Sequence, residues 1–243
     1  MELCQRCNKR EAKYIVGGRR LCETCARDEI VKRVRKEIHN SKMFSFKDKV
    51  VIIVPDNLNQ LAEILSQIVG KACYTCKLQI DKVNIKTEIN TDSNINDYIW
   101  KIIMYSKSLA DYKVKILPFP SNFFLAYLLY SVSTKDYSYI NYVTSYKLLS
   151  DGTRFFIPLY SISLLELNAF GEIKEISFND EIFDAIFRWV NTQLAENYEL
   201  FHTFIASTSL FNSARCKSCD AFIESGEYCA RCKRTLTSPF PPY

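Results

Sequence analysis

Residues 50–70 read VVIIVPDNLNQLAEILSQIVG, and this stretch decides the fold class. Its first five residues are apolar and β-branched without interruption, which is typical of a strand buried on both faces of a parallel sheet. From Leu58 to Val69 the apolar residues fall on one face of a helix, and Gly70 is placed to end it. A buried strand followed at once by an amphipathic helix is the start of a parallel α/β arrangement.

The same alternation continues through the middle of the chain. Strands separated by helices of a dozen or more residues pair in parallel through crossovers, which predicts an α/β, Rossmann-like open sheet with helices on both faces. A capping box, Ser163-Leu-Leu-Glu166, marks one further helix start. The other expected elements are strands at 83–89 and 114–117, helices at 95–109 and 121–130, and a long helix that Asn179 caps and that runs toward Glu199.

All ten cysteines fall in Cys-x-x-Cys pairs, and four of the five pairs lie near the two ends of the chain. Two such pairs folded together present four thiolates at the corners of a tetrahedron, about 2.3 Å from a zinc ion. A site closed by four cysteines has no open coordination position, which predicts a structural role; disulfides or free thiols are the alternative. We expect two structural zinc ions in zinc-ribbon modules, one held by Cys4, Cys7, Cys22 and Cys25, the other by Cys216, Cys219, Cys229 and Cys232.

The fifth pair, Cys73-Tyr-Thr-Cys76, stands alone in the sequence. In an extended strand, residues three apart point to opposite faces, so both sulfurs bind one metal only where the chain turns. We expect ordinary thiols or a local disulfide at Cys73 and Cys76. Half of a metal or iron–sulfur site and a redox pair are the alternatives.

Positive charge gathers near the N-terminus. Residues 1–49 contain 14 Lys and Arg against 7 Asp and Glu, whereas the net charge of the whole chain is only +5. A helix is expected from Ala26 to His39, with an apolar residue at every fourth position and basic residues around the rest. It fits either a solvated helix docked through its apolar face or a basic helix facing phosphate. The candidate contacts to nucleic-acid phosphates are Arg19, Arg20, Lys32, Arg33, Arg35 and Lys36.

The loop after the first strand lacks what a nucleotide site needs. In nucleotide-binding α/β folds this turn is rich in glycine, so that backbone N–H groups can approach a phosphate. Residues 54–60 read VPDNLNQ: there is no glycine, Asp56 would repel a phosphate, and Pro55 has no N–H. The loop at 118–121, PFPS, is equally poor in phosphate-binding groups. The sequence therefore predicts no ATP site and no catalytic residue set.

The chain divides into five segments. No stretch approaches the roughly 18 apolar residues that a membrane span needs, and the N-terminus has no apolar signal segment, so we expect a cytoplasmic protein with no membrane partner. In a reducing compartment the paired cysteines are expected to bind metal. The expected segments are an N-terminal zinc ribbon at 1–26, a basic linker helix at 27–48, an α/β domain at 49–213, a C-terminal zinc ribbon at 214–236 and a disordered tail at 237–243.

These features together resemble the cytoplasmic tRNA wobble-uridine 2-thiolation proteins. That family consists of PP-loop ATPases with an adenine nucleotide alpha hydrolase-like fold and zinc-ribbon ends. The matching stretches are Cys4–Cys25 with the basic helix behind it, Phe156-Ile-Pro-Leu-Tyr160 leading into Leu165-Glu166, and Phe187–Phe211 running into the last cysteine cluster. The resemblance covers nearly the whole chain, and its motifs outside the cysteines are weak.

The chain departs from the family at the catalytic motifs. Catalytic members carry a Ser-Gly-Gly-x-Asp-Ser loop after the first strand, where this chain has Pro55–Gln60, and a Gly-His-Asn-x-Asp-Asp element, where it has Phe119–Leu125. The family's cluster-binding cysteines lie just before the helix that leads to the second element. Cys73 and Cys76 lie about 45 residues upstream, so no iron–sulfur cluster is expected. The similarity is therefore closer to the family's degenerate partner subunit.

The resemblance implies a non-catalytic subunit of a tRNA 2-thiolation complex, which forms 2-thiouridine at the wobble position. Such a subunit would stabilise an active PP-loop paralogue in a heterodimer or heterotetramer and help to bind tRNA, and a ubiquitin-like sulfur carrier would act through the partner. One alternative is an active tRNA sulfurtransferase that uses Cys73 and Cys76 with an atypical ATP loop. Another is a zinc-ribbon nucleic-acid-binding adaptor unrelated to thiolation.

Overall fold

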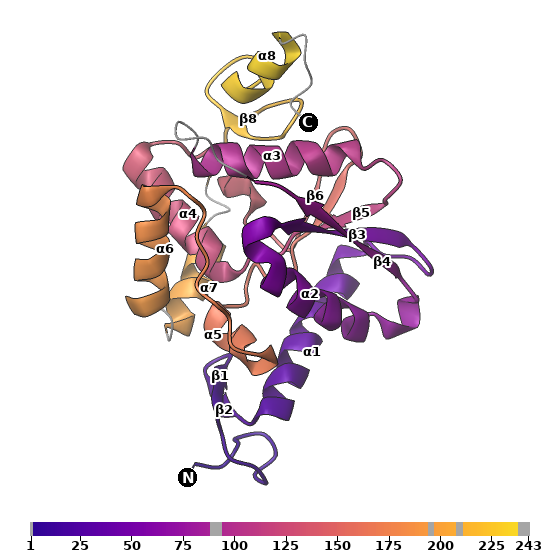
Figure 1. The fold of residues 1–243 in the computed structure, drawn as a ribbon, viewed down its shortest axis with the longest axis vertical. Coiled ribbons are helices and arrows are strands. Elements are labelled where there is room, and N and C mark those ends of the chain that lie inside the picture. The colour runs from indigo at the N-terminus through magenta and orange to yellow at the C-terminus, as the bar shows by residue number, and fades with distance from the viewer. Residues whose placement is uncertain (1, 88–93, 194–196, 208–210, 238–243) are drawn as a thin grey trace.

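The computed structural model, shown in Figure 1, describes residues 2–87, 94–193, 197–207 and 211–237. At its centre lies a five-stranded sheet with the strand order β4-β3-β5-β7-β6. The first four strands in this order are parallel, and β6 closes one edge in the antiparallel direction. This arrangement confirms the predicted α/β class. The strands are β3 (Lys49–Pro55), β4 (Gln79–Ile85), β5 (Val114–Ile116), β6 (Tyr146–Leu148) and β7 (Arg154–Phe156).

β3 is the central strand that its apolar sequence predicts. Residues 50–54 are all buried, because β3 pairs over its full length with β4 on one side while Ile52 lies opposite Ile116 of β5 on the other. The chain runs from β3 outward to β4 and then back past β3 to β5. The strand order therefore reverses between β3 and β5, and ligands of open α/β sheets bind at such a reversal.

Helices surround the sheet, with α2 and α3 on opposite sides of it (Figure 1) because their crossovers run in opposite directions. α4 and α6 pack against each other, and so do α1 and α2. The helices are α1 (Glu23–Ser41), α2 (Asn59–Ala72), α3 (Ile95–Ser108), α4 (Ser121–Thr134), α5 (Leu164–Leu167), α6 (Glu181–Gln193), α7 (Tyr198–Ser207) and α8 (Ala230–Thr237), with single 3-10 turns at Asp56–Leu58, Tyr74–Cys76, Ile140–Tyr142 and Asn168–Phe170.

Two predicted elements have different limits in the structure. The single helix expected from Asn179 to Glu199 is wrong, because α6 ends at Gln193 and α7 is a separate helix. The start of α6 is capped by Asp180 and not by Asn179, because the Asp180 carboxylate accepts the Phe183 N–H at 3.0 Å. The strand expected at 83–89 begins earlier, at the start of β4, where half-exposed edge residues hide the apolar pattern. Residues 88–89 and the tail at 238–243 lie outside the described residues.

The two end modules lie at opposite ends of the long axis of the molecule (Figure 1). The N-terminal one is built on the hairpin of β1 (Tyr14–Val16) and β2 (Arg19–Leu21), the C-terminal one on β8 (Ala214–Arg215) and β9 (Phe222–Ile223). Gly17, at the first hairpin's tip, has a φ of 58°, which favours glycine. Among the described residues, no helix has the length and apolar character to cross a bilayer.

Candidate functional site

The N-terminal module gathers four cysteines around a space for one metal ion. Cys4 and Cys7 come from the first loop, and Cys22 and Cys25 flank the first turn of α1. All four sulfurs lie within 4.8 Å of one another, with Cys7 and Cys22 3.9 Å apart. Thiolates about 2.3 Å from a central ion stand about 3.8 Å apart, so the spacing fits tetrahedral coordination. Cys7 is half-buried, whereas the other three are buried.

The thiols of this set ionise unequally. Burial raises the pKa of Cys25 to about 12. Burial also opposes ionisation of Cys4, but backbone hydrogen bonds, led by that of Cys22, outweigh it and lower the pKa of Cys4 to about 6. A metal must therefore displace protons from some of these sulfurs, and its binding will depend on pH.

The C-terminal module forms a second four-cysteine set from Cys216, Cys219, Cys229 and Cys232, and all of them are buried. Cys219 and Cys229 lie 3.7 Å apart, which again fits one ion. Side chains of the α/β domain contact these sulfurs. The indole N–H of Trp100 donates to the Cys232 sulfur at 3.3 Å, and the Tyr139 hydroxyl lies 3.8 Å from the Cys219 sulfur. Such contacts orient metal ligands and tune their charge.

Ion pairs hold this second module on the domain. Lys147, which is buried on β6, contacts Asp220 at 2.6 Å. Arg231 of α8 contacts Asp97 of α3 at 2.7 Å. In Figure 1 the module sits directly above α3. It therefore behaves as part of the domain surface and not as a tethered appendage.

The crevice at the strand reversal, where a nucleotide would bind in this fold, is filled with aromatic side chains. Phe119, from the loop after β5, stacks on Phe123 of α4 with ring centroids 4.4 Å apart. Phe178 packs against Phe123 at 5.3 Å and against Tyr98 of α3 at 5.5 Å. The Tyr98 hydroxyl donates to Asn57 at 2.8 Å, in the loop after β3. All four rings are buried, so protein atoms occupy the space between the ends of β3 and β5. A cavity of about 500 Å³ remains beside it, between residues 56–61 and residues 173–176.

Phe178 is the last residue of a segment without helix or strand, Glu172–Phe178, which we call the strap. Asn57 donates to the Ser177 carbonyl at 2.7 Å, which joins the loop after β3 to one end of the strap. Gln60 fixes the other end, because its side chain accepts the Lys174 N–H at 3.0 Å and donates to the Glu172 carbonyl. The residues that replace a phosphate-binding loop therefore bind the strap.

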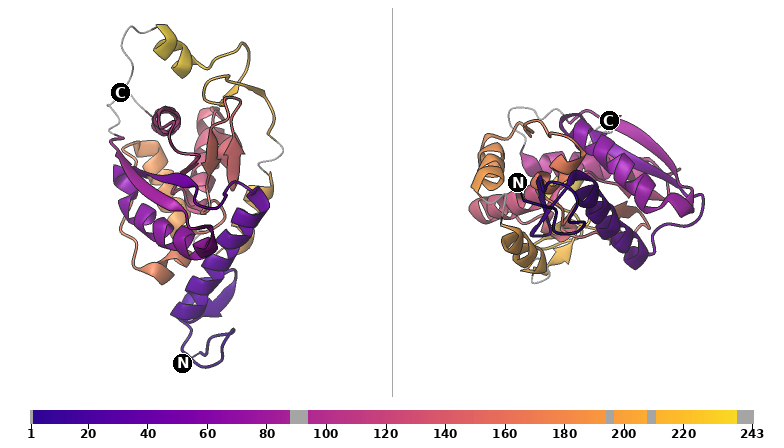
Figure 2. Two further views of the ribbon diagram at one scale, coloured as in Figure 1. Left: turned by 90° about the vertical axis from the view of Figure 1, so that its right-hand side faces the viewer. Right: turned by 90° about the horizontal axis from the view of Figure 1, so that it is seen from below.

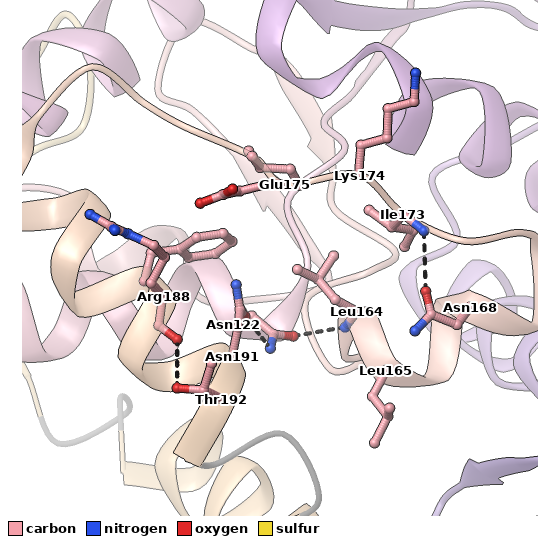
Figure 3. Close-up of a pocket in the computed structure, with 12 residues that line it drawn as sticks. Asn122, Leu164, Leu165, Asn168, Ile173, Lys174, Glu175, Arg188, Asn191 and Thr192 are labelled. Carbon is pink, nitrogen blue, oxygen red and sulfur yellow. Dashed lines mark hydrogen bonds between the residues drawn. The ribbon is translucent and has the colours of Figure 1, made fainter.

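A cavity of about 400 Å³ lies between the strap, α5 and α6, and Figure 3 shows its lining. Asn122 anchors one side: it donates to Asn191 at 2.8 Å and accepts the Leu164 N–H at 2.8 Å. Lys174, Glu175 and Arg188 also line the cavity. Its lining contains charged and amide groups and the hydroxyl of Thr192, but no cysteine, serine or histidine.

The six predicted phosphate contacts differ in their surroundings. Arg33 pairs with the buried Glu166 at 2.7 Å, and Arg35 donates to the Ala72 carbonyl at 3.1 Å. Lys32 and Lys36 are exposed on α1 and have no ion pair among the described residues. The remaining two, Arg19 and Arg20, pair with Glu29 at 3.0 Å and Glu2 at 2.9 Å. Their role toward tRNA stays a prediction.

Cys73 and Cys76 form a disulfide, one of the two states expected for them. The bridge follows the last turn of α2 and precedes β4. It therefore lies at the amino edge of the parallel sheet, whereas the crevice lies at the carboxyl edge. No sequence pattern marked Trp100, Tyr139 or Phe178 as functional, whereas Glu166 was visible as part of a capping box.

Comparison with known proteins supports the fold. No family model matches the chain, and no curated protein matches it in sequence. In structure, the chain is similar to the U34-tRNA thiolase NcsA from Methanococcus maripaludis with its [4Fe-4S] cluster. The TM-score is 0.62 at 13% sequence identity, and the match covers 96% of this chain and 95% of that chain. The match covers nearly the full length of both chains, so the overall fold is shared.

The cofactor prediction is wrong and is corrected by this comparison. It assigned zinc to both cysteine sets and excluded an iron–sulfur cluster, yet a solved structure with the same fold carries a [4Fe-4S] cluster. Four thiolates in a tetrahedral arrangement accept iron as well as zinc. The two sets are candidate metal sites by their geometry, and their assignment to zinc is withdrawn.

Proposed function

We propose that this protein is a non-catalytic subunit of a tRNA 2-thiolation complex. It would stabilise an active PP-loop paralogue, help to bind tRNA, and meet a ubiquitin-like sulfur carrier only through that partner. The fold it shares with a U34-tRNA thiolase over nearly the full length of both chains supports the connection to thiolation. That neighbour is itself an enzyme, so the non-catalytic role rests on this chain's own residues.

The filled crevice is the observation that carries the non-catalytic role. An ATP-dependent reaction needs a phosphate cradle at the carboxyl ends of β3 and β5, built from free backbone N–H groups. In this chain Asn57 and Gln60 bind the strap there, and the ring of Phe178 lies between Tyr98 and Phe123. A nucleotide would have to displace these buried side chains.

The location of the disulfide argues against the alternative of a thiolase that uses Cys73 and Cys76. These sulfurs lie at the amino edge of the sheet, at the opposite ends of β3 and β4 from the crevice. A sulfur transferred from them could not reach a substrate activated at the carboxyl edge without a large rearrangement. The subunit role needs no such movement.

The test combines deletion with nucleotide binding. Deleting the gene should lower 2-thiouridine in bulk tRNA, measured by mass spectrometry of nucleosides, and the purified chain should show no heat of binding with Mg–ATP in calorimetry. The variant Asn57→Ala removes the hydrogen bond from this loop to the strap and should also bind no ATP. Unchanged 2-thiouridine after deletion, or thiolation of tRNA by this chain alone, would contradict the proposal.

Metal analysis belongs to the same purification. Because a relative in fold carries iron, iron and zinc per chain should both be measured. Iron bound by thiolates absorbs visible light, whereas zinc does not, so the spectrum distinguishes them directly.

A further inference from the structure

Two exposed aromatic side chains, Phe46 and Tyr74, lie on neighbouring segments at the amino edge of the sheet. Phe46 is 60% exposed, and Tyr74 is 73% exposed. Lysines surround the first ring: the Lys47 ammonium lies 5.4 Å from its centroid and the Lys77 ammonium 5.9 Å. Rings exposed to this extent gain nothing from the protein core, and flanking cations make them suitable for anionic aromatic ligands.

The two segments are fixed relative to each other. The Lys47 N–H donates to the Cys76 carbonyl at 2.8 Å, which joins the Phe46 segment to the turn that carries Tyr74. The Cys73–Cys76 disulfide closes that turn. The two rings are therefore presented on a surface with limited freedom, which reduces the entropy cost of binding.

The charge around the rings is positive. Lys42 and Lys71 are exposed, and neither has an acidic partner among the described residues. The nearest acid in sequence, Asp48, is mostly buried and already pairs with Lys113 at 3.0 Å. Arg35 of α1 donates to the Lys71 carbonyl at 3.2 Å, so a further cation of α1 lies at the end of α2 that leads into the Tyr74 turn.

We propose that this surface, the aromatic–basic patch, binds unpaired RNA. Bases would stack on Phe46 and Tyr74 while lysines contact the flanking phosphates. Stacking needs bases that are free of a duplex, so single-stranded ends and loops fit the patch and paired stems do not. The patch consists of Phe46, Lys47, Tyr74 and Lys77. It uses no residue of the crevice or of the cysteine sets, so it does not depend on the role in thiolation.

The test measures binding of the full chain to fluorescent RNA by anisotropy. One probe is an oligouridine of about 12 nucleotides, and the other is a blunt duplex of the same length. Phe46→Ala and Tyr74→Ala should each weaken oligouridine binding about tenfold, whereas Phe46→Tyr should keep it. Lys47→Gln with Lys77→Gln should reduce the dependence of affinity on salt concentration. Tyr146→Ala is the matched control, an exposed tyrosine on β6 at the opposite edge, and should bind like the original chain.

Three results would overturn the proposal. The first is an oligouridine affinity that neither aromatic substitution changes. The second is equal affinity for duplex and single strand. The third is a loss of binding to a protein partner in the two alanine variants with full RNA binding, which would make the patch a protein interface. Melting temperatures of all variants should match that of the original chain, because both rings are exposed.

Discussion

The two four-cysteine sets have the same ligands but different surroundings. In the C-terminal set all four cysteines are buried, and Trp100 and Tyr139 of the domain contact the sulfurs. In the N-terminal set Cys7 is half-buried, and no side chain from the α/β domain contacts a sulfur among the described residues. Figure 2 shows the N-terminal module projecting from the body along α1. Four cysteines thus indicate a metal site in both modules. The contacts around each set decide whether the metal stabilises the whole domain or the module alone.

One buried carboxylate connects the N-terminal module to the domain. Glu166 of α5 accepts the Gly17 N–H at 2.9 Å and the Arg33 guanidinium at 2.7 Å. It also completes its own capping box by accepting the Ser163 N–H at 2.9 Å. A second link is the Arg27 hydrogen bond to the Ala169 carbonyl at 2.6 Å. Besides the apolar packing of β1 against α5, the N-terminal module is therefore held by a few polar contacts, which can be tested one at a time.

The largest expected difference comes from breaking each metal site. Cys219→Ser should lower the free energy of unfolding of the whole domain by on the order of 5 kcal/mol, because the second module is part of its packed surface. Cys7→Ser should release the N-terminal module but leave urea unfolding of the α/β domain within about 1 kcal/mol. Circular dichroism follows the unfolding, and limited proteolysis follows the first module. Equal losses from the two substitutions would refute the comparison.

Removing the carboxylate that holds the N-terminal module should have the next largest effect. Glu166→Gln leaves Arg33 without its charged partner and should cost about 3 kcal/mol in urea unfolding. Glu63→Gln is the control, because Glu63 forms an exposed pair with Lys82 at 2.7 Å and should cost less than about 1 kcal/mol. If both variants unfold at the same urea concentration, Glu166 does not anchor the module.

The sulfur contact of Trp100 should be visible in metal release. Trp100→Phe keeps an aromatic ring but loses the N–H donated to Cys232, which should weaken metal binding at the C-terminal set about tenfold. A competing chelator would report the change as faster release of one of the two metal ions. Trp189→Phe, at a half-exposed tryptophan on α6, should leave both release rates unchanged. The same result for both tryptophans would show that the contact does not matter.

The smallest effect is expected at low pH. Partial burial would raise the pKa of Asp151, but the hydrogen bond from Lys107 outweighs it and holds that pKa below its usual value. Because the folded-state pKa is lowered, the pair stabilises the fold above the unfolded-state pKa of about 3.9 and loses this effect as pH falls through the folded-state value. Asp151→Asn should cost less than about 1 kcal/mol at pH 7 and nothing at pH 2. Urea midpoints across this range would check it, and a constant difference would contradict it.

Much of the fold was predictable from sequence because its signals are local. The apolar run at 50–54 marks a strand that is buried on both faces, and the helix that follows has a continuous apolar face. β4 was placed too late because an edge strand has few buried positions. The antiparallel direction of β6 had no local signal, since it depends on how a three-residue strand meets β7.

The features of the candidate site also fall into those with a local sequence signal and those that depend on contacts between distant segments. The cysteine sets could be predicted because each pair is held by short-range spacing, and the missing phosphate loop was visible as an absence of glycine. The filling of the crevice was not, because Phe178 reaches Tyr98 only after the chain has folded. The pairing of Arg33 with Glu166 could not be predicted either, because the two residues are 133 positions apart in sequence.

The contact between Trp100 and Cys232 also bears on when the two metal sites can form during synthesis of the protein. These residues are 132 positions apart, so the last cysteine leaves the ribosome long after α3 has been synthesised. The N-terminal set is complete once Cys25 has emerged and can take up its metal during synthesis. The C-terminal set is complete only after Cys232 has emerged, much later in synthesis than α3. Scarcity of metal at the C-terminal set should therefore leave the surface of α3 exposed, available to chaperones or to aggregation.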